Sequence, residues 1–552
     1  MMHLYRALQF IAVLFLFSAF ALAQQASPVP QPEMTAEKWH EDLRFFASEI
    51  EQTHKNAFNA VSREQFQAAV DELDKQIPTL EAHQIVAGLM RLTAMIGDGH
   101  TGFRWGPMAA EGVLPVGFYW FEDGIFVRRV ASSESEILGA RLTEVGGVPV
   151  DSAVERLKPM IWRDNEMGVK SAAPIYLSVP RILHAAGLSN AKNAGTFTFE
   201  KDGKRFTRTL SPAAKLADLW SKPEGWLDAM APAGELPLFA REPQNRFWFT
   251  IVPESKTLYV QFNEVLDKPE ETVADFFARV FKEAEEKPVE RLVLDMRLNG
   301  GGNNYLNIPI ITGAVRSRLN AKGKFFVIIG RETFSAAQNT VNDLEKYTNA
   351  IFVGEPTGAS PNHFGDARRF TLPNSKFQIQ ASTLWWQDMD PRDTRKWKAP
   401  DVAADITFAD YRAGRDPAME AILKYTPTES MADIVAATRT TGDVADFIAR
   451  YRRFKANPAH KYADTLTTLN RVGHFLLGQK RTDDALTLFK INAEDYPSSA
   501  IVYQSLGDVY DIKGEKALAL ENYRKAVALD QSLSEAKKAI RRLSAELGNK
   551  NN

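Results

Sequence analysis

The sequence predicts a multi-domain α/β protein whose central domain holds a mostly parallel β-sheet. Between residues 257 and 354, short runs of apolar, β-forming residues alternate with amphipathic helical segments. Strands that are apolar on both faces and separated by helices are typical of parallel sheets covered by helices on both sides. Helical patterns also occupy the N-terminal part of the chain and its C-terminal end.

The chain is too long for a single hydrophobic core. Its 552 residues suggest roughly three or four domains at about 150 residues each. The formal net charge of −2 gives no basic surface for nucleic acid, so a nucleic-acid partner is not expected. Cysteine is absent, which excludes disulfides and thiolate metal sites. We expect no cofactor and no metal.

Residues 1–23 are predicted to be a signal peptide. Arg6 precedes an apolar run from Phe10 to Leu22, and Ala21-Leu22-Ala23 forms a small-x-small cleavage site. The run is shorter than the ~20 residues that span a bilayer, so no stable transmembrane anchor is expected. The sequence therefore predicts export to the periplasm or secretion, with an uncleaved N-terminal anchor as the alternative.

An N-terminal helical domain is predicted over residues 33–105. Ser62 and Gln65 have the spacing of a capping box at the start of one of its helices. The last helix runs into the loop Asp98-Gly99-His100-Thr101, where two glycines place an acid and an imidazole on a non-helical backbone. Such a loop is either a plain turn with a solvated histidine or part of a functional site.

A β-rich module is predicted over residues 112–160. Its stretch from Gly139 to Val150 resembles the strand, glycine turn and strand of PDZ-like modules, which bind an extended peptide at a sheet edge. An ordinary hairpin is the alternative. A further hairpin is predicted between Thr196 and Leu210, around Asp202-Gly203.

The central domain is predicted over residues 161–408. Strands are expected at 257–263, 291–296, 325–330 and 351–354, with helices at about 271–286 and 335–347. Functional groups gather at the carboxyl ends of parallel strands, and two of these ends carry Gly300-Gly301-Gly302 and Ser335. A serine that opens a helix is most often an N-cap, but the free N–H groups beside it can also hold an oxyanion.

The C-terminal end reads as a helical linker, 409–465, followed by repeats over 466–545. Positions in one repeat recur 34 residues later, as Leu469, Gly473, Leu476, Ala485 and Phe489 followed by Tyr503, Gly507, Tyr510, Ala519 and Tyr523. This is the period and pattern of tetratricopeptide repeats (TPR). We expect the repeats to dock a protein partner or deliver substrate; an unrelated helical bundle is the alternative.

Three segments of the central domain resemble motifs of the tail-specific, or C-terminal processing, serine peptidases, the family that includes the tricorn protease core. They are LVLDMRLNGGG at 292–302, TFSAAQ at 333–338 and VGEPTG at 353–358. The resemblance implies a ClpP/crotonase-like peptidase core that cleaves polypeptide substrates. It also implies that Ser335 is the nucleophile and that the N–H groups of Gly301 and Ala336 form the oxyanion hole.

The sequence departs from the processing peptidases at the general base. Those enzymes use a lysine beyond the serine, but no lysine lies between Lys346 and Lys376, and Ser360 stands at the corresponding place. The glutamate usual three residues after the nucleophile is Gln338.

A histidine is therefore expected to serve as the base. The tricorn-like branch places one before the PDZ-like module, which is where His100 lies, and an imidazole that is mostly neutral near pH 7 can accept the serine proton. His363, in a loop after a core strand, is the alternative base. Asp98 and Asp393 are the candidates to orient the base.

Three functions follow from these motifs. The first is an exported serine peptidase that works through an acyl-enzyme, with His100 as base. The second is a catalytically inactive ligand-binding or scaffold protein on the same fold, favoured by the missing lysine and by Gln338. The third is acyl-thioester chemistry at the same oxyanion hole, which the predicted signal peptide argues against.

Overall fold

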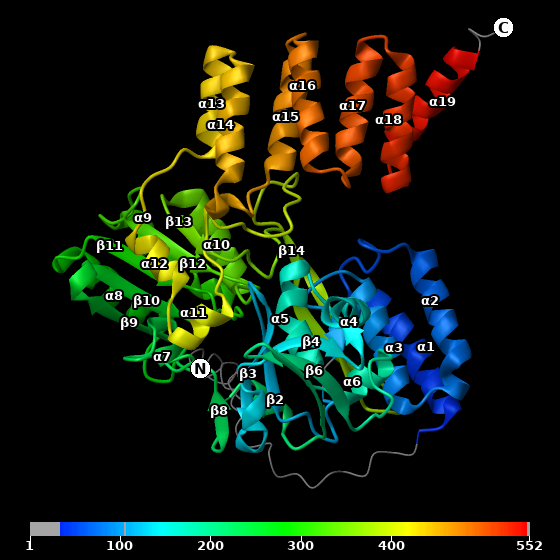
Figure 1. Ribbon diagram of the computed structural model, residues 1–552, viewed down its shortest axis with the longest axis vertical. Coiled ribbons are helices and arrows are strands. Elements are labelled where there is room, and N and C mark those ends of the chain that lie inside the picture. Colours follow the sequence, from blue (N-terminus) through cyan, green and yellow to red (C-terminus); the bar gives the residue numbers. More distant parts are fainter. Residues whose placement is uncertain (1–33, 104–105, 222, 549–552) are drawn as a thin grey trace, which may run out of the picture.

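The computed structural model describes residues 34–103, 106–221 and 223–548. The predicted signal peptide lies outside these residues. The architecture is mixed α/β, with three sheets and a long C-terminal row of helices that stands beside the sheet-bearing parts (Figure 1). Within the described ranges, no helix is both long enough and apolar enough to cross a bilayer.

Three N-terminal helices form where the sequence predicts them: α1 (Ala36–Thr53), α2 (Arg63–Gln76) and α3 (Ala82–Met95). The predicted capping box is confirmed, since the Ser62 side chain accepts from the Gln65 N–H and the Gln65 side chain accepts from the Ser62 N–H. The apolar faces of these helices share one hydrophobic core with the neighbouring antiparallel sheet.

We call that antiparallel sheet the module sheet, because it contains the β-rich module. Its strands are β2 (Val116–Phe121), β3 (Gly124–Ala131), β4 (Arg141–Val145), β5 (Val148–Pro149), β6 (Gly195–Lys201), β7 (Lys204–Leu210) and β8 (Trp226–Asp228). The predicted hairpin at Asp202-Gly203 is confirmed as β6–β7. Because β6 pairs with β4, the sheet continues past residue 160, the end expected for the module.

Helices α4 (Val150–Leu157), α5 (Glu166–Tyr176) and α6 (Pro180–Ala185) lie between β5 and β6 in the chain. The first two pack on the module sheet, and α6 packs on α3. The N-terminal helices and the module sheet thus share one hydrophobic core.

The central sheet has the order β16-β13-β12-β11-β10-β9. Its strands are β9 (Phe247–Val252), β10 (Thr257–Phe262), β11 (Arg291–Asp295), β12 (Phe325–Ile329), β13 (Ile351–Gly354) and β16 (Val402–Ala403). The four strands predicted from the apolar runs are present, and they pair in parallel. The antiparallel edge strand β9 and the two-residue β16 were not predicted.

Helices cover both faces of the central sheet. The short helix α7 (Leu238–Arg241) precedes the sheet, and the helices α8 (Val273–Glu286), α9 (Ile308–Arg316) and α10 (Ala336–Tyr347) lie within its connections. Residues of α8, α9 and α10 form the core of one face, and residues of α12 (Pro417–Leu423) contribute to the core of the other. The predicted doubly covered parallel sheet is therefore confirmed.

A small third sheet, the bridging sheet, has the order β1-β15-β14. It consists of β1 (Gly102–Phe103), β14 (His363–Thr371) and β15 (Gln378–Trp386). Gly102 pairs with Gln380, so the chain just after His100 is bonded to a strand inserted between β13 and β16 of the central sheet. This pairing brings the loop of His100 and the loop of His363 to the same region.

The C-terminal region is helical, as predicted. After α11 (Phe408–Ala413) and α12 come α13 (Met431–Thr441), α14 (Val444–Ala456), α15 (Thr465–Gly478), α16 (Thr482–Asp495), α17 (Ala500–Ile512), α18 (Lys516–Leu529) and α19 (Ser534–Gly548). Consecutive helices from α15 to α19 pack on one another. A Cβ added at Gly473 would lie 2.4 Å from the Phe489 ring, and one at Gly507 would lie 2.7 Å from the Tyr523 ring. The small repeated residues are thus required by close helix packing.

Candidate active site

Ser335 lies at the turn between β12 and α10 in a backbone conformation that is unusual for a residue with a side chain. Its φ is 55° and its ψ is −127°, and its side chain makes no capping hydrogen bond to the helix. The ordinary N-cap role is therefore absent. A serine held in a strained turn between strand and helix is the arrangement that exposes a nucleophile in several hydrolases.

Gly301 lies directly against Ser335. A Cβ built on Gly301 would stand 2.7 Å from the Ser335 Cβ and 2.9 Å from the Ala336 nitrogen, and its φ is +101°. The neighbouring strands β11 and β12 therefore bring the glycine run to the serine, as their parallel order predicts. Only a residue without a side chain fits this position.

The two expected oxyanion donors differ in their hydrogen bonds. Ala336 is the first residue of α10, so its N–H has no partner within the helix and is available to a ligand. The Gly301 N–H, in contrast, donates to Asn299 Oδ1 at 2.9 Å. For the Gly301 N–H to bind an oxyanion, its hydrogen bond to Asn299 has to be shared or broken.

Gly301→Ala is expected to lower the reactivity of Ser335 by about 10²–10³, the effect of losing one oxyanion donor. The added methyl group would force the backbones of Gly301 and Ala336 apart. The rate of labelling by a fluorophosphonate probe measures the loss. Gly300→Ala is the matched control, because a Cβ there has open space; equal labelling rates in the two variants would contradict the assignment.

His100 packs against Phe334, the residue before Ser335, and is not hydrogen-bonded to Ser335. Its ring stacks on Phe334, with ring centroids 4.5 Å apart. Both ring nitrogens are buried, and neither has a hydrogen-bond partner among the residues described. Burial lowers the pKa of His100 to about 4, and the nearby His363 ring adds to this effect. The imidazole is therefore neutral at physiological pH, as a general base has to be.

His363, the alternative base, stacks on His100 with ring centroids 5.8 Å apart and an interplanar angle of 13°. Its Nδ1 lies 3.1 Å from the carbonyl oxygen of Ser360. A carbonyl can only accept, so Nδ1 carries the hydrogen and Nε2 of the neutral ring is an acceptor. Burial lowers the pKa of His363 as well. Both imidazoles thus lie at the site, and only His363 has an orienting hydrogen bond.

Asp98 holds the backbone of the His100 loop rather than the His100 ring. Its Oδ1 accepts from the N–H groups of His100 and Thr101 at 2.7 and 2.8 Å, and from Ser382 Oγ at 2.9 Å. Its Oδ2 accepts from His54 Nε2 at 2.7 Å. Burial opposes the ionisation of Asp98 and is the largest single influence, but the hydrogen bonds from His54, Thr101 and His100 and the charge of His54 together hold the pKa of Asp98 below its usual value.

Asp164, which was not predicted as a site residue, joins the two histidine-bearing loops. Its Oδ1 accepts from the Gly99 N–H at 2.5 Å, and its Oδ2 accepts from the Ser360 N–H at 3.3 Å. Burial raises the pKa of Asp164 to about 7, and the nearby carboxylate of Asp98 contributes. Because its partners lie 65 and 196 residues away in the chain, no local pattern could identify it.

Asp393 does not orient either imidazole. Its carboxylate pairs with Arg395 at 2.7 Å, and Arg395 also pairs with Glu345. Only the Asp393 carbonyl oxygen approaches the site, where it accepts from Asn362 Nδ2 at 3.3 Å. The orienting role proposed from the sequence is therefore not realised by its side chain.

Gln338, which replaces the glutamate usual in the processing peptidases, is fully buried in α10. Its Nε2 donates to Asn342 Oδ1 at 2.8 Å, whereas its Oε1 has no hydrogen-bond partner in the described part of the chain. The side chain is held inside the helix packing by this one bond.

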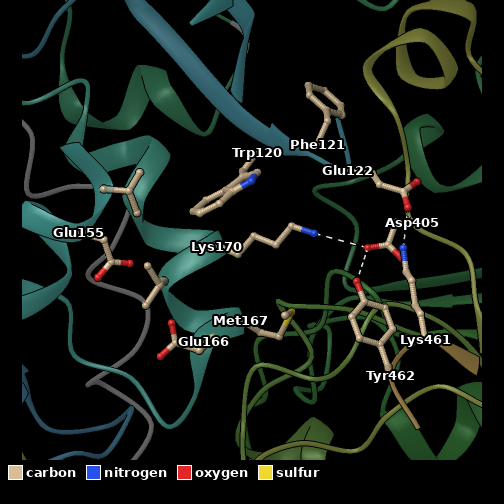
Figure 2. A pocket seen from close by; sticks show the side chains of 12 residues that line it. Trp120, Phe121, Glu122, Glu155, Glu166, Met167, Lys170, Asp405, Lys461 and Tyr462 are labelled. Carbon is tan, nitrogen blue, oxygen red and sulfur yellow. Dashed lines mark hydrogen bonds and ion pairs between the residues drawn. The ribbon is translucent and has the colours of Figure 1, made fainter. Parts of the chain in front are cut away.

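A cavity of about 400 Å³ lies where the module sheet, the central domain and the segment before the repeats meet (Figure 2). In it, Lys170 points toward Asp405, which also accepts from the Tyr462 hydroxyl at 2.5 Å and pairs with Lys461 at 2.8 Å. The Lys170 amine also pairs with Glu355 at 2.8 Å.

Arg331, in the turn that leads to Ser335, contacts Lys170 of this cavity by donating to its carbonyl oxygen at 3.4 Å. Its guanidinium donates to both carboxylate oxygens of Glu355, at 2.8 and 2.5 Å, and to the Trp120 carbonyl at 2.7 Å. The arginine side chain is only 3% exposed. A chain of ion pairs thus connects the turn of Ser335 to the linker that carries the C-terminal helices.

No family model and no curated protein matches the chain. Among solved structures it resembles mature CPAF complexed with lactacystin (12% identity, 74% of this chain and 99% of that chain, TM-score 0.49). It also resembles the photosystem II D1 C-terminal processing protease (14%, 67% and 94%, 0.33) and a putative peptidase from Parabacteroides merdae (14%, 72% and 100%, 0.36). These similarities are too distant to decide an activity, which has to be inferred from the site.

Proposed function

We propose that the protein is a serine peptidase that hydrolyses polypeptides through an acyl-enzyme, with Ser335 as the nucleophile. The observation that carries the proposal is the strained, uncapped Ser335 packed against Gly301, with His100 stacked on the adjacent Phe334 and His363 stacked on His100. A serine that served only to cap α10 would need neither the strain nor the adjacent bases.

In this mechanism an imidazole accepts the Ser335 proton as Oγ attacks the peptide carbonyl. The N–H of Ala336 then stabilises the oxyanion, joined by Gly301 once its N–H leaves Asn299. The imidazolium returns the proton to the departing amine, and a water molecule hydrolyses the ester in the second half-reaction. His100 is the base we favour, because its ring packs on the residue adjacent to the serine; His363 is the alternative.

His100 has to move before it can act. Neither of its nitrogens bonds to a described residue, so a turn toward Oγ would break no hydrogen bond, but the ring would have to shift against Phe334 and His363, on which it stacks. Catalytic hydrogen bonds are often long or misaligned before substrate binds and tighten in the complex. Burial also makes the imidazolium costly, and the nearby Asp98 carboxylate offsets part of that cost.

The other regions are assigned roles from the sequence. We propose that the chain is exported, that the module sheet receives an extended segment of the substrate at its edge, and that the C-terminal helices are tetratricopeptide repeats that dock a protein partner. The ion-pair chain from Arg331 to Lys461 gives these helices a physical connection to the turn of Ser335.

A second candidate is a ligand-binding protein that has lost catalysis. It is favoured by the Gly301 N–H already occupied by Asn299 and by the absence of any hydrogen bond from His100 to Ser335 in the described residues. Such a protein would bind polypeptide without cleaving it, and its melting temperature would rise with that ligand.

Ser335→Ala is expected to abolish both fluorophosphonate labelling and peptide hydrolysis while leaving the fold intact. The measurement uses the chain without residues 1–23, an unfolded polypeptide as substrate, and circular dichroism to verify folding. Ser133→Ala, at an exposed serine of the module sheet region, is the control and should keep full activity. Hydrolysis that persists in Ser335→Ala would refute the nucleophile. A wild-type chain that never labels but is stabilised by the polypeptide would favour the binding protein.

A further inference from the structure

Three potential metal ligands meet where the N-terminal helices contact the module sheet. Glu81 precedes α3, His83 lies in its first turn, and His184 lies in α6. His83 Nε2 and His184 Nδ1 are 2.8 Å apart although the residues are 101 positions apart in the chain. One ligand atom from each of the three residues lies within 4.8 Å of the other two.

The hydrogen bond between His83 and His184 indicates protonation states that allow the two side chains to bind a cation. A hydrogen bond between two ring nitrogens requires that one of them accepts, so at least one imidazole is neutral. The His83 side chain is only 4% exposed, and its Nε2 faces His184 Nδ1. Neutral imidazoles and a carboxylate are the ligands that zinc binds in His₂Glu sites.

We propose that Glu81, His83 and His184 bind one Zn²⁺ ion, with water in the fourth position. Zinc–nitrogen bonds of about 2.0–2.1 Å require the two ring nitrogens to separate by only about half an ångström from their present spacing. The proton that the two rings share is displaced when the ion binds. The sequence indicates no such site, because the two histidines are far apart and neither belongs to a metal-binding motif.

The Lys192 amine would compete with the Zn²⁺ ion for the Glu81 carboxylate. Its amine lies 2.7 Å from Glu81 Oε2, but both side chains are about half exposed, at 53% and 49%. An exposed ion pair of this kind is weak, so a divalent ion can take the place of the lysine. Arg181, another cation near His83, is itself paired with Glu111.

The position of the ion gives it a structural role. It would fasten the start of α3 to α6, and α3 leads at its other end into the loop that carries Asp98 and His100. The helix has 14 residues, so the ion would lie about 20 Å from that loop, measured along the helix axis. The ion is therefore not part of the chemistry at Ser335, and its binding is independent of the proposed peptidase activity.

The test is a titration of the chelator-treated chain with Zn²⁺ alone, by calorimetry and by competition with a chromogenic zinc indicator. One ion per chain is expected, with a rise in melting temperature on binding. His184→Ala, at a half-buried position that tolerates the change better than His83, should weaken binding at least tenfold and remove the thermal shift. His40→Ala, which removes a histidine of the neighbouring α1, should bind as the wild type does.

Lys192→Gln should bind Zn²⁺ more tightly than the wild type, because the competitor for Glu81 is gone. Glu81→Gln should bind more weakly. The proposal is overturned if the wild type takes up no stoichiometric zinc, if His184→Ala and His40→Ala bind equally well, or if neither Lys192→Gln nor Glu81→Gln alters the affinity.

Discussion

Replacing His100 by alanine is expected to lower kcat/KM for peptide hydrolysis by about 10²–10⁴, the usual contribution of a general base. The ring makes no hydrogen bond to any described residue, so its removal costs packing against Phe334 but breaks no polar network. A loss of activity with an unchanged circular dichroism spectrum would therefore mean that His100 acts in the chemical step rather than in folding. The assay is steady-state hydrolysis of a fluorogenic peptide.

His363→Ala is the matched comparison, since the His363 ring stacks on His100 but is held by a hydrogen bond to the Ser360 carbonyl oxygen. We expect a smaller loss, from altered packing around His100. The reverse result, with His363→Ala inactive and His100→Ala nearly active, would assign the base to His363.

The pH dependence of peptide hydrolysis provides an independent test of whether His100 is the base. A general base has to be neutral, and burial lowers the pKa of His100 to about 4 from an ordinary value near 6.5. Activity should therefore be retained as the pH falls through 6 and 5, and should decline only near pH 4. An acidic limb near pH 6.5 would instead mean that the base is a solvated imidazole.

Replacing Glu355 by alanine is expected to destabilise the protein by about 3–5 kcal/mol, because it leaves a buried charge without its partner. Arg331 is 3% exposed, and Glu355 accepts two of its hydrogen bonds. Lys170 loses a partner in the same variant. The midpoint of urea unfolding, followed by tryptophan fluorescence, measures the change.

The control for this variant is Glu290→Ala, which breaks an exposed pair with Lys256. Exposed pairs contribute about 0–1 kcal/mol, so its midpoint should hardly move. Arginine holds the pKa of Glu355 well below its usual range. The stabilisation is therefore present above the ordinary carboxyl pKa and is lost as the pH falls toward the folded-state value. Equal midpoints for the two variants would show that the buried pair is not required.

Local patterns were sufficient to predict the central sheet. The apolar runs of β10 to β13 identified each strand and their parallel order, and that order placed Gly301 beside Ser335. The edge strand β9 was missed although its sequence, FWFTIV, is rich in β-forming residues, whereas β16 is too short, at two residues, to show any sequence pattern.

The surroundings of the histidines could not be predicted, because they depend on contacts between distant segments. His54 directly follows α1 and bonds Asp98, which lies 44 residues away in the chain. Asp164 bonds Gly99, in the loop after α3, and Ser360, in the loop after β13, which are far apart in the sequence. The Gly301 N–H donates to the Asn299 side chain, two residues earlier. This bond depends on the backbone angles of the intervening turn, which cannot be read from the amino-acid composition.

The pairing of β1 with β15 has a consequence for when the protein becomes active. Ser335 belongs to the central sheet, while His100 reaches it only after Gly102 and Phe103 have joined a strand formed by residues 378–386. A chain whose N-terminal helices have not docked has a serine without its proposed proton acceptor. In the proposed mechanism, the site at Ser335 is therefore complete only when the N-terminal helices and the bridging sheet have assembled.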